Sequence, residues 1–442
     1  MSELQIKTDF KTQIKNEFDK LQSSLNGSTG SEINLARKEA FDTFFIQGLP
    51  TLKSENWKYT NLTFLNKLEL ISASKESNVN DLNVEELYYG RLDSYKIYLV
   101  NGRFSKDLSD NISLQGLAVS SFNTLSAKGI GRYSEYFGKL THNTSHPFVS
   151  VNTALSDSVL VIEIDKGVII EKPLQIINIT DSRENAVISN PRILIISGKS
   201  SSVKIVESNY TIGSNPGIKN IVKEFFLDDN AHLNYYKIQD DSEFSYTFDF
   251  TQANQKRDSH FDEAAISING RYIRNDLRAT LDGENIESHF YGLFIAGNSD
   301  FVDNHTIVDH AKPNCMSNEN YRGIMFDKST GVFNGKIMVR RDAQKTNAYQ
   351  SNKNVLLSDN ATINTKPELE IYADDVKCSH GATSGALDKT SLFYLRARGI
   401  DEKNAEIMLL NAFAAEVVAE IKIDELKELI LQRIENKLNN AN

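Results

Sequence analysis

The fold of this chain is decided by a stretch that reads Val159-Leu160-Val161-Ile162-Glu163-Ile164, followed by the turn Asp165-Lys166-Gly167. A short segment that is rich in β-branched residues and closed by turn residues predicts a β-strand. The same arrangement returns at Arg192-Ile193-Leu194-Ile195-Ile196, which is closed by Ser197-Gly198-Lys199. Residues 155–385 show no convincing helical periodicity, so the sequence predicts one long all-β region.

Turn signals recur along this region at short intervals. They include Asp228-Asp229-Asn230, Asn269-Gly270, Asp282-Gly283 and Ser358-Asp359-Asn360. An all-β run of this length is too long for one ordinary sandwich, whereas stacked repeats of ~20–45 residues would give roughly five to twelve rungs. Because the sequence shows no strict repeat, periodicity favours a β-solenoid and leaves a double sandwich open.

The amino-terminal part of the chain has helical periodicity instead. Residues 5–25 place apolar side chains at spacings of three and four, and a second helix is expected after Ser31. The only tryptophan, Trp57, follows, and we expect it to pack against these helices rather than to line a ligand site. We assign residues 1–85 to an amino-terminal helical region.

The helical period returns at the carboxy-terminal end. Asp388, Asp401 and Asp424 each precede an amphipathic stretch and are expected to cap a helix. Apolar surface that these helices do not use to pack on one another is a candidate docking surface. This divides the rest of the chain into a β-helix core, residues 86–385, and a carboxy-terminal helical region, residues 386–442.

Composition restricts the class of function. The 442 residues include 49 Lys and Arg against 59 Asp and Glu, a net charge of -10. Nucleic acids and anionic membranes need concentrated positive charge, so we expect neither as a partner. No apolar run approaches the ~20 residues of a spanning helix, and the amino terminus lacks a signal-peptide pattern. The sequence has only two cysteines, which indicates a reducing cytoplasm.

One segment near the end of the β region carries chemistry. Cys378 and His380 stand two residues apart, so an extended backbone would project both side chains from one face, with Lys377 and Ser379 on the other. A thiolate beside an imidazole suits iron, copper or zinc. Two ligands do not complete a site, so any metal here needs further ligands from elsewhere, such as another chain.

Structural interpretations of these residues stay open at this point. Free cysteine is among the most buried residue types, and a lone Cys-x-His is a weak motif. The sequence does not say whether Cys315 meets Cys378 or has any role. The central histidines are interpreted as solvated or hydrogen-bonded side chains, because no consistent face brings them together; they are His232, His260, His289, His305 and His310.

Motifs of self-contained enzymes are missing. The sequence has no phosphate-binding loop, no dinucleotide glycine fingerprint and no Gly-x-Ser-x-Gly elbow. It also lacks His-Glu-x-x-His and paired Cys-x-x-Cys motifs. The residues therefore predict a protein that is not an enzyme.

A series of motifs in one order resembles a known family. The series comprises Asn334-Gly335-Lys336-Ile337, Ala343-Gln344-Lys345-Thr346-Asn347-Ala348, Val355-Leu356-Leu357-Ser358, Pro367-Glu368-Leu369-Glu370-Ile371, Ala373-Asp374-Asp375-Val376, His380-Gly381-Ala382-Thr383 and Leu392-Phe393-Tyr394-Leu395-Arg396-Ala397-Arg398-Gly399-Ile400. Together these motifs resemble the SufB/SufD family, the scaffold subunits of the SUF machinery for iron–sulfur cluster assembly. Trp57-Lys58-Tyr59-Thr60 and Gly381 after His380 are similar to the SufD branch.

The resemblance implies a mainly β fold, a right-handed parallel β-helix flanked by amino-terminal and carboxy-terminal helices. It implies a non-enzymatic scaffold that pairs with a SufB-like subunit and docks a SufC-like ATPase on its carboxy-terminal helices. Cys378 and His380 would form a shared metal half-site at the partner interface. Alone, the chain would hold no cofactor stably and could form a homodimer; in the complex, iron or a nascent cluster would bind transiently.

Two other hypotheses belong to different classes. A β-helical carbohydrate-active enzyme is the alternative, because that architecture hosts many such activities and fold does not fix function. A purely structural partner that positions an ATPase and touches no metal is the other. The cluster type, the sulfur and electron donors, and the balance between homodimer and heterodimer are not predicted by the sequence.

Overall fold

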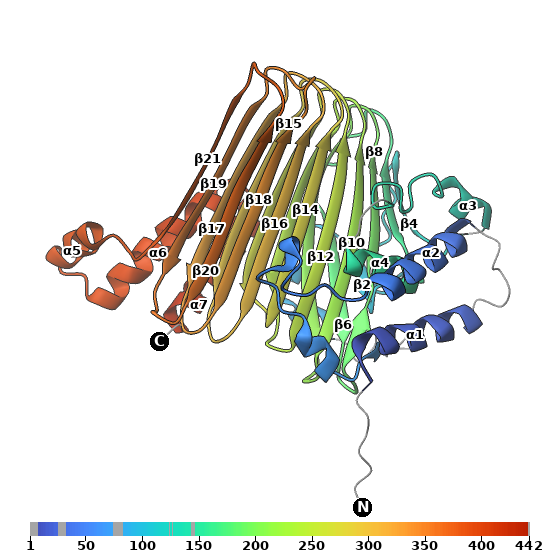
Figure 1. Ribbon diagram of the computed structural model, residues 1–442, viewed down its shortest axis with the longest axis horizontal. Coiled ribbons are helices and arrows are strands. Elements are labelled where there is room, and N and C mark those ends of the chain that lie inside the picture. The colour runs from blue at the N-terminus through green and yellow to red at the C-terminus, as the bar shows by residue number, and fades with distance from the viewer. Residues whose placement is uncertain are drawn as a thin grey trace, which may run out of the picture.

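The computed structural model describes residues 8–24, 32–73, 83–122, 124–125, 127–142 and 146–440. The ends of the helix expected over residues 5–25 fall partly outside these ranges. Within them the chain forms a parallel β-solenoid between two sets of helices (Figure 1). The predicted mainly β fold with helical ends is therefore confirmed.

Two sheets face each other along the solenoid, and each coil contributes one strand to each sheet. Sheet A consists, along its path, of β20 (Thr362–Ile371), β18 (Thr330–Val339), β16 (Phe301–His310), β14 (Tyr272–Leu281), β12 (Ser245–Gln255), β10 (Gly217–Leu227), β8 (Arg192–Ser197), β5 (Leu160–Ile164) and β4 (Leu117–Ser121), with β7 (Val187–Ser189) and β1 (Ile71–Ser72) off the path. Sheet B consists of β21 (Lys377–Gly385), β19 (Asn347–Leu356), β17 (Met316–Met325), β15 (Glu287–Ala296), β13 (His260–Asn269), β11 (His232–Asp240), β9 (Ser202–Ile212), β6 (Leu174–Asp181), β2 (Tyr95–Val100) and β3 (Arg103–Ser105).

The coils stack in register. Tyr272, Phe301 and Thr330 are successive Cα partners in sheet A, so a coil takes 29 residues there. A turn at one corner of the coil places Asn230, Asn285 or another short polar residue in the left-handed region, at φ values of 55° and 58° for these two. Asparagine tolerates this conformation better than other residues with a side chain. The turn signals seen in the sequence thus mark the corners of the coils.

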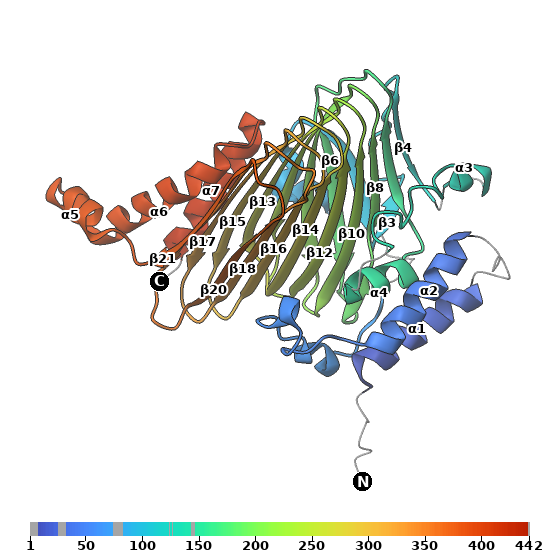
Figure 2. The same ribbon diagram turned by 45° about the horizontal axis from the view of Figure 1, so that its top comes forward.

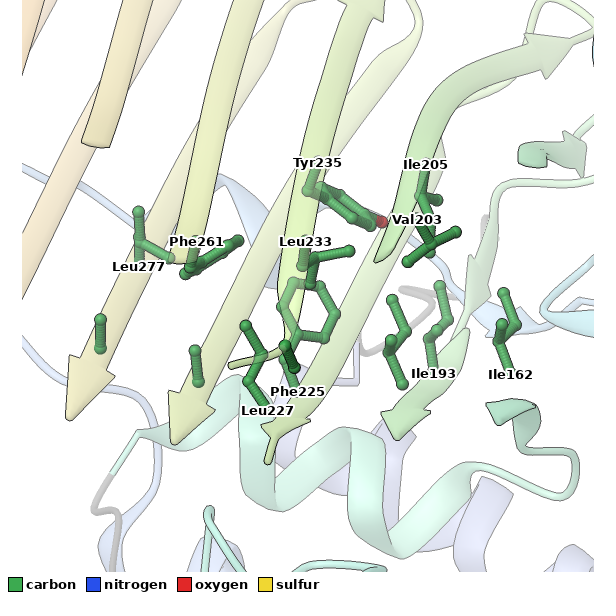
Figure 3. Close-up of a cluster of buried hydrophobic side chains, with 14 of the residues drawn as sticks. Ile162, Ile193, Val203, Ile205, Phe225, Leu227, Leu233, Tyr235, Phe261 and Leu277 are labelled. Carbon is green, nitrogen blue, oxygen red and sulfur yellow. The ribbon is translucent and has the colours of Figure 1, made fainter. Parts of the chain in front are cut away.

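Apolar side chains from both sheets fill the space between them (Figure 3). Strand residues alternate between the two faces, so every second residue points inward. The interior also buries charged groups, which are paired as buried ions must be. Lys223 Nζ lies 2.7 Å from both Glu207 and Asp249, and Lys237 Nζ lies 3.0 Å from Asp249.

Amino-terminal helices cover part of the outer face of sheet A. They are α1 (Phe10–Ser24), α2 (Glu32–Gln47) and, later in the chain, α4 (Pro147–Leu155); α3 (Ala127–Arg132) lies nearby. Their apolar residues form one cluster with Phe248 and Tyr272 of sheet A. Trp57 is buried in the same cluster, so its predicted packing role is confirmed.

Carboxy-terminal helices cover sheet B instead. They are α5 (Lys389–Ala397), α6 (Glu402–Val418) and α7 (Asp424–Asn440), of which α6 and α7 lie along the sheet and α5 projects away from it (Figure 2). Asp388 and Asp401 cap α5 and α6 through backbone N–H groups, as predicted. Asp424 is itself the first residue of α7. The division of the chain at residues 85 and 385 stays a prediction.

Candidate functional site

The solenoid ends at a coil that nothing in the described chain covers. Strands β20 and β21 are the last strands of their sheets, so each has a neighbour on one side only. Most side chains of β21 are exposed, and those of β20 are mostly half-buried. We call this face the open end of the solenoid. A free strand edge presents unpaired N–H and C=O groups to any chain that adds to it.

Cys378 and His380 both lie on β21 at the open end. Their Cα partners on β19 are Ala348 and Gln350, which are buried in the interior. Residues at one register position in successive coils form a column across the sheet. Cys378 and His380 are the last members of two such columns that face the interior, and they share one face of the strand. His380 is exposed, whereas Cys378 is half-buried.

The thiol of Cys378 is not activated in the chain by itself. It packs against a cluster that includes Ile337, Val339 and Ala373. Burial raises the pKa of Cys378 above its usual value, and a backbone hydrogen bond to Ala348 opposes this only in part. The thiolate is the form that binds metal. A metal ion or a charged partner group must therefore displace the proton before Cys378 can act as a ligand.

Further ligands are not supplied by the part of the chain that the structure describes. Its residues contain no group of three or more His, Cys, Asp or Glu side chains that could hold a metal ion. Cys378 and His380 are therefore a pair of candidate ligands to which the described residues add no third.

The second cysteine lies deep in the solenoid. Cys315 is 1% exposed and belongs to the interior apolar cluster. Its Sγ lies 3.2 Å from the carbonyl oxygen of Gly283, and burial raises its pKa to about 11. Both cysteines are free thiols. Cys315 is two coils away from the strand of Cys378, so the two do not meet.

The central histidines have structural partners. His310 is buried beside Ser317 Oγ at 2.8 Å, and burial lowers its pKa to about 4, so it is neutral. His305 Nε2 lies 2.9 Å from Asp303. The rings of His232 and His260 stack on the outer face of sheet B, with centroids 4.4 Å apart. These contacts agree with the interpretation of His232, His260, His305 and His310 as hydrogen-bonded or solvated side chains, whereas Nδ1 of His289 is buried without a hydrogen-bond partner among the described residues.

The amino-terminal segment reaches the open end along the outside of sheet A. The guanidinium of Arg274 lies 3.7 Å from the ring centroid of Trp57, and Lys366 Nζ of β20 lies 2.7 Å from Glu55. A polar cavity of about 300 Å³ lies between this segment and the sheet. The segment thus contacts the last coil from the outer side of sheet A.

Two interior residues behind His380 were missed by sequence reasoning. Glu319 is fully buried, and burial raises the pKa of its carboxyl to about 7. Gln350 Nε2 donates a hydrogen bond to Glu319. Gly335 makes room for this amide, since a Cβ there would lie 2.3 Å from Gln350 Nε2. The coil spacing is the only signal that would have placed these residues in line with His380.

The fold and the candidate residues define a class: a parallel β-solenoid with helical arms, with a cysteine and a histidine on its last strand. Family models match almost the whole chain. Residues 178–413 match "SUF system FeS cluster assembly, SufBD core domain", and residues 8–176 match the SufBD protein N-terminal region. The chain belongs to the SufBD family, and the predicted resemblance is confirmed.

Relatives of known name support this assignment. The iron–sulfur cluster assembly protein SufD of Escherichia coli is 31% identical over 88% of this chain and 90% of its own. An iron–sulfur cluster assembly SufBD family protein of Synechocystis is 30% identical over 95% of both chains. SufD of Bacillus subtilis is 27% identical over 87% of this chain and 89% of its own. Among the described residues, no helix is long and apolar enough to cross a membrane.

Proposed function

We propose that the protein is a non-enzymatic scaffold subunit for iron–sulfur cluster assembly, in which Cys378 and His380 supply half of a shared site. The observation that carries this proposal is the position of the pair. Both residues lie on the last strand of the solenoid, in inward-facing columns that end in solvent. A partner that covers the open end can therefore add the missing ligands without disturbing the interior.

The partner at the open end is a SufB-like subunit in this proposal. The free edges of β20 and β21 offer backbone hydrogen bonds to a strand of the partner. Ile363 and Leu369 of β20 are half-buried and offer some apolar surface to the same chain. When the SufB-like subunit is missing, a second copy of this chain can use the same edges to form a homodimer.

The carboxy-terminal helices are the proposed docking site for a SufC-like ATPase. Helix α5 projects from the body of the molecule and has no buried residue. Its Phe393 and Tyr394 are 74% and 57% exposed. Exposed aromatic residues on a projecting helix are typical of an interface hot spot. Family membership favours this role over the carbohydrate-active alternative.

Iron and the nascent cluster are substrates of the assembly and bind transiently, with no cofactor held by the isolated chain. The raised pKa of Cys378 supports this, because an uncomplexed thiol keeps its proton. Two free cysteines and no disulfide agree with the cytoplasm as the proposed compartment.

The proposal is tested with Cys378→Ser and His380→Ala in the complex with the SufB-like and SufC-like partners. Reconstitution with iron and sulfide should give much less cluster chromophore in both variants, while the complex still forms. Ser379→Ala is the matched control, because Ser379 lies on the same strand and faces the other way; it should assemble normally. Normal chromophore in both variants, with the complex intact, would remove Cys378 and His380 from the site.

A further inference from the structure

A column of three side chains leads from the interior of the solenoid to the open end. Glu319, Gln350 and His380 occupy successive coils of sheet B, where Gln350 is the Cα partner of both Glu319 and His380. Adjacent strands lie about 4.8 Å apart, so each side chain has the next as its neighbour. This inference rests on the proposed role of His380 as a ligand.

The amide of Gln350 is bonded on one side only. Its Nε2 donates to the carboxylate of Glu319, in the coil behind. Its Oε1 is buried and has no hydrogen-bond partner in the part of the chain that the structure describes. A buried amide oxygen without a partner costs free energy. The imidazole of His380 is the register neighbour in the coil ahead, and it is exposed and therefore able to rotate.

Charge fixes which way the amide points. An ionised carboxylate can only accept hydrogen bonds, so it takes the NH₂ group of Gln350 and leaves the oxygen for another donor. The pKa of Glu319 is about 7, so the carboxyl is ionised at about pH 8. At that pH a ring N–H of His380 is the donor that the oxygen lacks.

We propose that Gln350 is a positioning residue, which accepts a hydrogen bond from one ring nitrogen of His380 and thereby presents the other nitrogen, with its lone pair, at the open end. Glu319 anchors the amide from behind. Ligand histidines commonly donate their second N–H to an oxygen that fixes their tautomer and orientation. The interior of the solenoid would thus prepare the ligand before iron or a partner arrives.

The experiment measures the tautomer of His380 in the full chain without iron. Long-range ¹H–¹⁵N spectra of histidine-labelled protein at about pH 8 show which ring nitrogen carries the proton, because imidazoles are mostly neutral there. The signals of His380 are identified by their loss in His380→Ala. In the wild-type chain we expect one dominant neutral tautomer.

Two variants of Gln350 separate positioning from packing. Gln350→Met keeps the volume and removes the acceptor, so the tautomer ratio should relax by roughly fivefold, the effect of one hydrogen bond. The exchange of the two groups, Gln350→Glu combined with Glu319→Gln, keeps an acceptor beside His380 and a donor behind it, and should restore the dominant tautomer. The sequence has eight histidines, and unchanged signals of the other seven show that the fold is intact.

An unchanged tautomer ratio in Gln350→Met, with the fold intact, would overturn the inference. The proposed function fails separately, if His380→Ala assembles cluster normally in the complex. A Gln350→Met chain that shows altered signals for many histidines is replaced by Glu319→Gln. That variant removes the charge that orients the amide, and it should weaken the tautomer preference if the inference holds.

Discussion

Glu319 shows how a single residue can tie the stability of this fold to pH. Its pKa rises from an ordinary 4.5 to about 7 because burial disfavours the charged form. Both folded and unfolded chains bind the proton below about pH 4, so no difference is expected there. Between about pH 4.5 and pH 7 the unfolded chain releases this proton while the folded chain keeps it, so the folded state loses stability over this range, by on the order of 3 kcal/mol in total.

The variant Glu319→Gln removes this cost. We expect it to unfold at higher urea concentration than the wild-type chain at about pH 8, with little difference at about pH 4, because only the charged form is penalised. Urea unfolding at both pH values measures the effect. An equal gain at both pH values would show that packing, and not ionisation, is responsible.

At the same scale, the sequence predicted the pairing of Cys378 and His380 but not the residues behind them. Alternation along one strand places residues i and i+2 on one face, whatever the rest of the fold. Glu319 and Gln350 stand in different coils, so their contact depends on the coil spacing. That spacing is set by turns, and no strict repeat in the sequence reveals it.

Helix α5 is the element with the clearest surface for a test. Phe393→Ala combined with Tyr394→Ala should weaken ATPase binding by at least tenfold, a common effect for hot-spot aromatic residues. Both side chains are exposed, so the fold should keep its melting temperature. Binding is measured by calorimetry with the SufC-like protein. Ile46→Ala on α2, which removes a residue that is 82% exposed, is the matched control.

Deletion of the carboxy-terminal helices would be a poorer test. Helices α6 and α7 share an apolar cluster with Leu293, Ile295 and Ile324 of sheet B. Removing them would expose this face to water and destabilise the solenoid. If the variant with Phe393→Ala and Tyr394→Ala still binds the SufC-like protein normally, the docking site lies on an element other than α5.

The ends of the helices illustrate what sequence can predict about an element. Asp388 and Asp401 were recognised as caps because a short polar side chain just before a helix can accept hydrogen bonds from the free backbone N–H groups of its first turn. Which face α6 and α7 would cover could not be predicted. Their apolar faces could pack on any flat apolar surface. That this surface is the outer face of sheet B follows only from the folded solenoid.

The whole molecule carries an expectation about iron. The isolated chain should bind well below one iron per chain after desalting, because Cys378 keeps its proton and no third ligand lies among the described residues. Addition of the SufB-like partner should raise the iron retained. Metal analysis by mass spectrometry gives the stoichiometry, and one tightly held iron on the chain alone would contradict the half-site.

The two ends of the solenoid differ in a way that limits how chains can polymerise. At the first coils, β2 pairs with β3 and β4 with β5 in antiparallel fashion, and β3 and β4 are short. Among the described strands, only those at the far end, β20 and β21, have long, free parallel edges. An end-to-end contact therefore joins two far ends about a two-fold axis and consumes both. In the proposed pairing, growth would stop at two solenoids, so a protein made of stackable coils would not extend into filaments.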